Sequence, residues 1–221
     1  MITSAHNETL KDIRRLQRKR DGRFVAEGED LVEAAEAAGW MPLVRLEAGV
    51  DVEPEALAAV SSLGSGTRVL AVYEQRWAPA PLGPTAVYLH GVGDPGNVGT
   101  VLRSALAFGA ASVVLGPGCA DPFGPKAVRA SMGALFSVPV VRAELDDCPR
   151  PRIGLAARTG EVLAGPAEGT VVVGAERAGL PPEVLAACER TAHIPIASES
   201  LNAAMAASVA LYELARRVGP T

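Results

Sequence analysis

The fold is decided by one stretch near the end of the chain, Arg190-Thr-Ala-His-Ile-Pro-Ile-Ala-Ser-Glu-Ser-Leu-Asn-Ala-Ala-Met-Ala-Ala-Ser-Val-Ala-Leu-Tyr-Glu-Leu-Ala-Arg-Arg217. Its first part, His193 to Ile196, is a short apolar run closed by a proline, which predicts a strand. A small polar loop, Ala197 to Leu201, follows. Asn202 to Arg217 then has the residue spacing of a helix. The stretch therefore predicts a strand that leads through a polar loop into a terminal helix.

The predicted terminal helix combines large and small apolar residues. The large ones recur at helical spacing and predict one apolar stripe, formed by Leu201, Met205, Val209 and Tyr212. Ser200 precedes the helix and can cap it with its hydroxyl group. Small residues fill most of positions 203–210 and would let another backbone approach closely. Such a loop and helix can hold a small ligand, but a plain alanine-rich helix capped by Ser200 and Asn202 also explains the pattern.

The chain from Thr85 onward alternates between two kinds of segment. Continuous apolar runs predict strands at Ala86–Leu89, Ser112–Leu115, Val138–Val141, Ile153–Ala156, Val171–Val173 and His193–Ile196. Helical patterns lie between several of them, at Val98–Phe108, Pro125–Ser131 and Pro181–Glu189. Because continuous apolar strands are typical of sheets buried on both faces, we expect an α/β fold with a mostly parallel sheet.

The N-terminal part of the chain predicts a smaller α/β unit, residues 1–77. Helices are expected at Thr9–Arg20, Asp30–Ala38 and Pro54–Leu63, and strands at Arg23–Gly28, Met41–Leu46 and Arg68–Val72. Residues 78–84 are rich in proline, which fits neither a helix interior nor a central strand. We therefore expect a linker there, followed by a second domain at residues 85–221.

Composition excludes several classes of protein. The chain has 221 residues, of which 48% are hydrophobic, enough for one large domain or for an ordinary domain with a small companion. The three cysteines and three histidines are scattered, so we expect a reducing cytoplasm, no disulfide framework and no metal site. No apolar run has the length of a membrane span, and the first residues lack a signal-peptide pattern, so no membrane partner is expected.

The charge of the chain is uneven. Its net charge is −4, which argues against a wholesale polyanion binder. Basic residues nevertheless gather in one short segment, at Lys11, Arg14, Arg15, Arg18, Lys19, Arg20 and Arg23. A local basic face of this kind can bind phosphates, and the alternative interpretation is a solvated helix face.

Glycines at Gly91, Gly93 and Gly96 follow the first strand of the second domain and spell G-x-G-x-x-G. This spacing is the dinucleotide fingerprint, so an NAD-type oxidoreductase is one hypothesis. Two features weaken it. Pro95 removes a backbone N–H from the loop, and no acidic residue follows the next strand, which ends at Leu115.

The helix after this loop carries one arginine, Arg103. Asn97 can cap the helix, and Leu102 and Leu106 are core candidates. Taken alone, Arg103 is as well explained by a solvated helix surface.

A second loop, Val173-Gly-Ala-Glu-Arg-Ala-Gly-Leu-Pro181, connects a strand to a helix. Its glycines would let the backbone close around a flat ligand. Glu176 lies between them at the C-terminal end of a strand, which is where open α/β sheets keep their sites. A plain strand-to-helix turn is the alternative.

Together these stretches resemble the SpoU (TrmH-like) branch of the SPOUT RNA ribose 2′-O-methyltransferases, over essentially the whole segment 89–217. The three motifs of the family look like Asp94-Pro-Gly-Asn-Val-Gly-Thr-Val-Leu-Arg103, Val172-Val-Gly-Ala-Glu-Arg-Ala-Gly-Leu180 and Ile194-Pro-Ile with Ser200-Leu-Asn202. Residues 121–136 also resemble the family. Arg23–Gly28 is similar to the start of its ribosomal-protein-like RNA-binding domain. The chain departs from the family in a shorter third-motif loop without the usual glycine, and in a compact N-terminal domain.

The resemblance implies a C-terminal trefoil knot that binds S-adenosylmethionine, a homodimer packed through the knot with the final helix at the interface, and methyl transfer to a ribose 2′-oxygen without a metal. The methyl donor would lie against backbone around Ala157, Gly174, Ile194, Ile196 and Leu201. A non-catalytic RNA-binding relative with the same fold is a further hypothesis.

The resemblance also implies roles for polar residues. Arg103 matches the essential arginine, cast either as a base or as an electrostatic clamp. We favour the clamp because a guanidinium with a pKa above about 12 rarely gives up its proton. Ser200 and Asn202 would orient the hydroxyl group and the donor, and Glu176 would brace an arginine or the loop. RNA, with rRNA favoured over tRNA, would be bound by Asn97, Lys126 and Arg129 and by the basic residues Arg14, Arg15, Arg18, Lys19 and Arg23.

Overall fold

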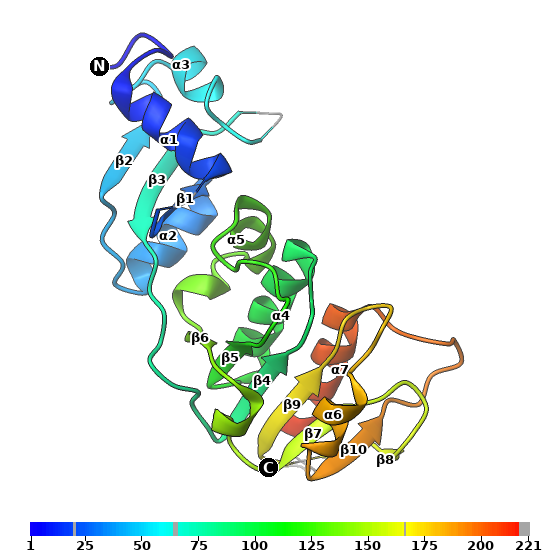
Figure 1. Cartoon of the computed structure of the whole chain (residues 1–221). Helices are drawn as coiled ribbons and strands as arrows, with labels where there is room; N and C mark the ends of the chain where they lie inside the picture. Colours follow the sequence, from blue (N-terminus) through cyan, green and yellow to red (C-terminus); the bar gives the residue numbers. More distant parts are fainter. Residues whose placement is uncertain (20, 64–65, 166, 217–221) are drawn as a thin grey trace.

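Two β-sheets organise the chain (Figure 1). The structure, a computed structural model, describes residues 1–19, 21–63, 66–165 and 167–216. A three-stranded antiparallel sheet near the N-terminus has the order β1-β3-β2, and a seven-stranded parallel sheet has the order β6-β5-β4-β9-β7-β10-β8. The expectation of an α/β fold with a mostly parallel sheet is confirmed.

The N-terminal sheet is covered on one face by α1 and α3. Helix α1 presents three apolar side chains at helical spacing, and Leu10, Ile13 and Leu16 are accordingly buried. The side chain of Asn7 caps this helix by accepting a hydrogen bond from the backbone N–H of Thr9 (2.9 Å). The elements of this part are α1 (Glu8–Arg18), β1 (Arg23–Glu27), α2 (Glu29–Ala37), β2 (Val44–Glu47), α3 (Pro54–Ala58) and β3 (Val69–Glu74).

A buried carboxylate, Glu27, holds this part together. It accepts hydrogen bonds from Gln17 on α1 (2.7 Å), from the hydroxyl of Ser61 (2.9 Å) and from the backbone N–H of Ser62 (2.9 Å). These donors satisfy a carboxylate that would otherwise be costly to bury. The Arg23–Gly28 stretch therefore has a structural reason for its acidic residue.

Aromatic residues join the two sheets. Phe24 and Tyr73 on the N-terminal sheet pack with Trp40 against Phe123 and Phe136 of the following part. The indole N–H of Trp40 donates to the backbone carbonyl of Phe136 (2.8 Å). The largest apolar cluster runs without a break from one sheet to the other. Rigid placement of the N-terminal part follows from this shared core.

The parallel sheet is buried on both faces because alternate side chains point to opposite sides. Val87 and Leu89 share a core with α4 and α7, whereas Tyr88 lies in a separate cluster with residues of α6. The elements are β4 (Thr85–Leu89), α4 (Pro95–Phe108), β5 (Ser112–Leu115), α5 (Pro125–Ser131), η1 (Ala134–Phe136), β6 (Val140–Arg142), η2 (Leu145–Asp147), β7 (Arg152–Leu155), β8 (Glu161–Val162), β9 (Gly169–Val173), α6 (Pro182–Ala186), β10 (Arg190–His193) and α7 (Ala203–Ala215).

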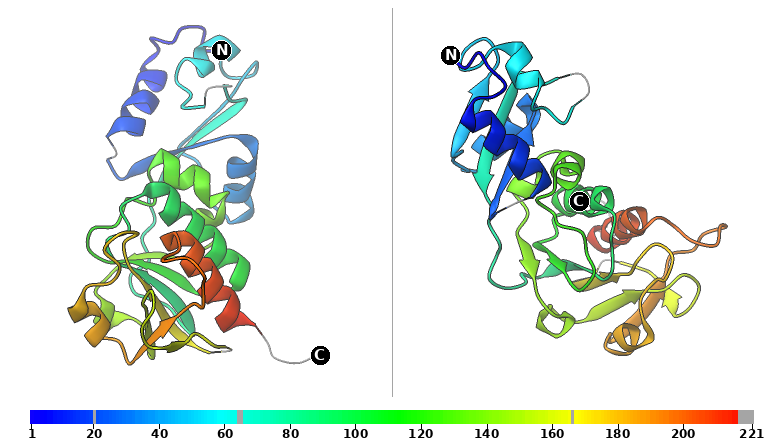
Figure 2. Two further views of the ribbon diagram at one scale, coloured as in Figure 1. Left: turned by 90° about the vertical axis from the view of Figure 1, so that its right-hand side faces the viewer. Right: turned by 45° about the horizontal axis from the view of Figure 1, so that its top comes forward.

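Helix α4 packs tightly on both of its neighbours, α5 and α7, and Figure 2 shows α4 and α7 side by side. Towards α5, a Cβ built on Gly99 would lie 2.3 Å from the carbonyl oxygen of Ala127, so only glycine fits there. Towards α7, the hydroxyls of Ser104 and Ser208 share a hydrogen bond (2.6 Å). The position of α4 is therefore fixed from two sides.

The apolar stripe predicted for the terminal helix lies on an exposed face of α7. The small residues of α7 are the buried ones, including Ala204, Ala207 and Ala210, because they allow α7 to approach α4 and the sheet. Met205, Val209 and Tyr212 are 57%, 40% and 53% exposed. Of the two predicted caps, Ser200 is wrong and Asn202 is confirmed, because its side chain accepts from the N–H groups of Ala204 (3.0 Å) and Met205 (3.2 Å).

The last strand lies three residues earlier than predicted. β10 spans Arg190–His193 rather than His193–Ile196, because Arg190–Ala192 pairs with β7 and His193 with Val162 of β8. The predicted helix Pro54–Leu63 ends earlier, at Ala58. The predicted helix ends at Arg20 and Arg217 lie outside the described residues.

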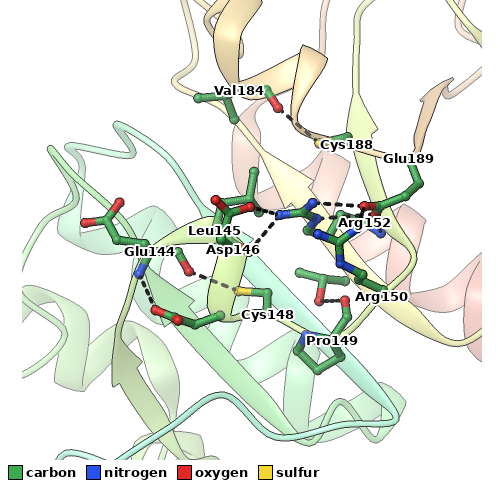
Figure 3. A network of polar contacts seen from close by, with 12 residues as sticks. Glu144, Leu145, Asp146, Cys148, Pro149, Arg150, Arg152, Val184, Cys188 and Glu189 are labelled. Atoms are coloured by element: carbon green, nitrogen blue, oxygen red, sulfur yellow. Dashed lines mark hydrogen bonds and ion pairs between the residues drawn. The ribbon is translucent and has the colours of Figure 1, made fainter.

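A buried arginine ties the second half of the sheet together (Figure 3). Arg152 starts β7, and its side chain is 4% exposed. It forms ion pairs with Glu189, which precedes β10 (2.9 Å), and with Asp146 of η2. The backbone N–H of Arg152 also donates to the Glu189 carboxylate (2.7 Å). This network fixes β7 to the segments before β10 and β7.

Candidate active site

A hollow of about 310 Å³ lies at the C-terminal ends of β7, β9 and β10. It is bordered by the loops that follow these strands and by the start of α7. All five residues predicted to contact a cofactor line it, namely Ala157, Gly174, Ile194, Ile196 and Leu201. Glu176 and Ser200 line it as well. Its volume is in the usual range for small-molecule sites, about 300–1,000 Å³, and its walls are mainly apolar, as such sites require.

The wall of this hollow at residues 174–179 is a tight hairpin. The N–H of Gly179 donates to the carbonyl of Ala175 (2.9 Å), and these two residues form an isolated antiparallel bridge. A Cβ at Gly174 would lie 2.2 Å from the carbonyl carbon of Gly179, so a side chain there would open the hairpin. The glycines therefore close the turn and leave residues 176–178 at its tip.

A second, wider hollow of about 630 Å³ adjoins the first. The hairpin residues 175–178 line both, so they form a wall that the two hollows share. The other side of the second hollow consists of Gly91, Gly93, Asp94, Asn97 and Asn202. Two ligands bound in these hollows would meet at the tip of the hairpin.

Asn97 connects the loops of the site. Its amide nitrogen donates to the Glu176 carboxylate, and its amide oxygen accepts from the amide nitrogen of Asn202 (3.0 Å). The three predicted motifs are thus joined through side chains. Asn97 does not cap α4 as the sequence suggested. Asp94 is the cap and accepts from the N–H groups of Gly96 (2.7 Å) and Asn97 (3.1 Å).

Asp94 also forms an ion pair with Lys126 at the start of α5 (2.6 Å). The ammonium group of Lys126, helped by the backbone N–H groups of Asn97 and Gly96, lowers the pKa of Asp94 below its usual value. Asp94 was missed as a site residue at the level of sequence. The signal was present, because an aspartate directly before a proline at the first helical position is a typical cap.

Arg103 lies apart from both hollows. It is exposed on α4, two turns into the helix, and lines neither the first nor the second hollow. Leu106, predicted to be in the core, is 49% exposed on the same helix. Within one copy of the described chain, Gly174 and Leu201 share a hollow that Arg103 does not border.

The cations predicted to bind RNA differ in what they contact. Arg15 and Arg23 are both paired with Asp12 and Asp21 (2.6–2.9 Å), and Arg23 holds the pKa of Asp21 well below its usual range. Lys126 is paired with Asp94, as described above. Arg14 donates to the carbonyl of Ala59 (3.1 Å), and Arg129 donates to the hydroxyl of Ser62 (3.2 Å). Arg18 and Lys19 are exposed and have no carboxylate partner among the described residues.

Two kinds of feature are absent from the described ranges of the chain. No group of three His, Cys, Asp or Glu residues there is placed to hold a metal ion. No helix in those ranges has both the length and the apolar character needed to cross a membrane.

Comparison with known proteins gives consistent matches. The sequence model of the SpoU rRNA Methylase family matches residues 84–212. The chain is 31% identical to the 23S rRNA (guanosine(2553)-2'-O)-methyltransferase RlmP of Bacillus subtilis (strain 168), over 96% of this chain and 98% of that one.

Solved structures agree. The AdoMet-bound rRNA methyltransferase from Sinorhizobium meliloti has a TM-score of 0.87 and 30% identity, with 99% of this chain and 98% of that chain covered. The SpoU methyltransferase AviRb from Streptomyces viridochromogenes in complex with AdoMet has a TM-score of 0.82 and 27% identity, with 95% and 97% covered.

Proposed function

This chain belongs to the SpoU rRNA methylase family, and on that premise we propose that it transfers a methyl group from S-adenosylmethionine to a ribose 2′-hydroxyl of rRNA. Two relatives, from Bacillus subtilis and Streptomyces viridochromogenes, are named for 2′-O-methylation of 23S rRNA, which makes this the favoured RNA. The single observation that carries the proposal is the pair of adjoining hollows that share the hairpin wall 175–178.

The first hollow would hold the methyl donor. Its apolar walls suit the adenine ring, and the backbone groups of the loops around Gly174, Ile196 and Leu201 would fix the polar parts. When bound, S-adenosylmethionine supplies a methyl group on a sulfonium, which is already a good leaving group. The tight hairpin keeps water from one side of this hollow.

The second hollow would hold the acceptor nucleotide. Asn97, Glu176 and Asn202 form one hydrogen-bonded chain at its wall and would orient the 2′-hydroxyl towards the first hollow. Ser200 borders the first hollow and would hold the donor in register. The hydroxyl is a poor nucleophile, so the main task of these residues is orientation, and the alkoxide that develops needs a nearby positive group.

Arg103 would supply this positive group from a second copy of the chain. It lies outside both hollows, but one turn away on α4 is Leu106, which is 49% exposed. Leu106, Met205, Val209 and Tyr212 form an exposed apolar set on α4 and α7, the apolar dimer patch. Exposed apolar groups of this kind mark association sites. We infer a homodimer through this patch, in which each Arg103 faces its partner's acceptor hollow.

A knotted C-terminal segment is part of the proposal. The connection between β8 and β9 crosses closely over the end of α7, because the N–H of Ala167 donates to the carbonyl of Leu214 (3.2 Å). A Cβ at Gly165 would lie 1.9 Å from the carbonyl oxygen of Glu213. β10 also inserts between β7 and β8. These close approaches support a trefoil knot. The proposal also takes residues 1–77 as the RNA-binding domain.

The test is transfer of labelled methyl groups to unmodified 23S rRNA and tRNA transcripts, followed by alkaline hydrolysis. A ribose 2′-O-methyl group blocks cleavage at its own nucleotide, so one resistant position in 23S rRNA is expected. Activity should fall steeply with added salt, because phosphate contacts release counterions. Label on a base, label only in tRNA, or binding of NAD in place of S-adenosylmethionine would contradict the proposal. Size measurement in solution tests the dimer, with Tyr212→Asp expected to give a monomer.

A further inference from the structure

One charged residue of the site has no role yet. Arg177 lies at the tip of the hairpin between Glu176 and Ala178 and lines both hollows. It is exposed, and no carboxylate in the described part of the chain forms an ion pair with it. The closed hairpin below it, with the N–H of Gly179 bonded to the carbonyl of Ala175 (2.9 Å), fixes where its backbone lies.

The other charged groups around the second hollow are engaged. Asp94 is paired with Lys126 (2.6 Å). The Glu176 carboxylate accepts a hydrogen bond from the amide nitrogen of Asn97. Arg177 is therefore the cation of this hollow that has no acidic partner among the described residues. An exposed guanidinium that forms no ion pair, beside an open hollow, can bind an anionic ligand.

We propose that Arg177 binds a phosphate of the acceptor RNA adjacent to the ribose that is methylated. This inference rests on the proposed function. In RNA the 2′-hydroxyl and the 3′-phosphate are attached to adjacent carbon atoms of the ribose, C2′ and C3′. A nucleotide whose 2′-hydroxyl faces the methyl donor therefore also places its 3′-phosphate close by. Arg177 borders both hollows, so it lies where such a phosphate has to be. A guanidinium can bind two phosphate oxygens at once and thereby fix the sugar.

The test uses the full-length protein and measures binding rather than turnover. Arg177→Ala, Arg177→Lys and wild type are compared for binding an unmodified 23S rRNA transcript, with saturating S-adenosylhomocysteine and over a series of salt concentrations. Arg158→Ala is the matched control, because Arg158 is also exposed, lies in a neighbouring loop and lines neither hollow.

Arg177→Ala is expected to bind the transcript about tenfold more weakly. The slope of log affinity against log salt should become shallower by about 0.7–0.9, the share of one phosphate contact. Arg177→Lys should keep most of the slope but not all of the affinity, because an ammonium group makes a single-point contact. Affinity for S-adenosylmethionine, measured by calorimetry, should match wild type in every variant.

Two outcomes would overturn the inference. If Arg177→Ala keeps the wild-type affinity and slope, Arg177 does not contact RNA. If it weakens S-adenosylmethionine binding and leaves RNA binding unchanged, Arg177 holds the carboxylate of the donor. Thermal unfolding of each variant excludes a folding defect. Failure of the proposed function is distinguishable, because wild type would then transfer no methyl group to rRNA whatever Arg177 does.

Discussion

Two regions of the parallel sheet use arginine in opposite ways. Beside the start of β7, Arg152 is 4% exposed and is paired with Asp146 and Glu189. Arg177, at the other end of the strands, and Arg103, two turns into α4, are exposed and have no carboxylate partner within the described residues. The first arrangement satisfies the cation inside the chain, and the second leaves it for a ligand. The partners of an arginine, more than its position in a motif, distinguish a structural role from a functional one.

The largest expected effect is on catalysis at the ligand-facing end. Replacing Arg103 with alanine should lower the rate of methyl transfer by about 10²–10³-fold, since a donor aimed at developing negative charge contributes on this scale. Single-turnover transfer to the 23S rRNA transcript measures it. Thermal stability should be unchanged, because Arg103 is exposed on α4. A variant Arg103→Lys with full activity would show that bidentate contact is not needed.

The next largest effect is on stability at the other end. Arg152→Met should lower the free energy of unfolding by about 1–3 kcal/mol, because Asp146 loses its ion pair and Glu189 keeps only Arg150 as a partner. Denaturant unfolding measures this loss. The transfer rate per folded molecule should be close to wild type, because Arg152 lies away from both hollows. If folded Arg152→Met protein lost methyl-transfer activity, Arg152 would not have a purely structural role, and the contrast between the two regions would be wrong.

A smaller loss of folding stability is expected at acidic pH. Arg152, through its guanidinium and then its backbone N–H, lowers the pKa of Glu189 from 4.5 to about 2. A carboxylate with a lowered pKa stabilises the fold at pH values above its unfolded pKa. That contribution should therefore decline as the pH falls from about 4.5 towards 2, and unfolding curves over this range measure it. In Arg152→Met the decline should be shallower, and an identical pH profile would contradict the assignment.

The smallest effect compares cations on α1. Arg15 is paired with Asp12 and Asp21, whereas Arg18 has no carboxylate partner among the described residues. Arg18→Gln should reduce the salt dependence of RNA binding by about one phosphate contact, and Arg15→Gln should reduce it less. Filter binding of the 23S rRNA transcript measures both slopes. If both variants reduced the salt dependence equally, RNA would displace the carboxylates of Asp12 and Asp21 from Arg15.

Much of the fold could be predicted from the sequence because its signals are local. Continuous apolar runs located most of the parallel strands, and β5 agrees at both ends with its prediction. Which face of α7 is buried could not be predicted from these local signals. Alanine and large apolar residues both fit a buried face, and only the close approach of α4 decides that Ala207 is buried while Met205 is exposed.

The residues of the candidate site also differ in whether local sequence signals identify them. Residues of the second and third motifs that line the first hollow were identified together, because glycines and small residues near strand ends leave a pattern in the sequence. The ion pair between Asp94 and Lys126 joins two distant segments, and Arg177 stands out because no carboxylate of the described residues pairs with it. Whether a charge is satisfied is set by which loop the fold brings against it, and sequence spacing carries no record of that.

The hydrogen bond from Trp40 to the carbonyl of Phe136, inside the aromatic cluster, has a consequence for substrate choice. Together with the aromatic cluster, it holds the N-terminal part against the parallel sheet, so the fold sets the separation between the basic helix α1 and the hairpin tip at 176–178. Under the proposed function, an RNA would be modified only if its folded shape presents its backbone and a reactive ribose at that separation. Selection among the many riboses of a ribosomal subunit would then depend on three-dimensional spacing.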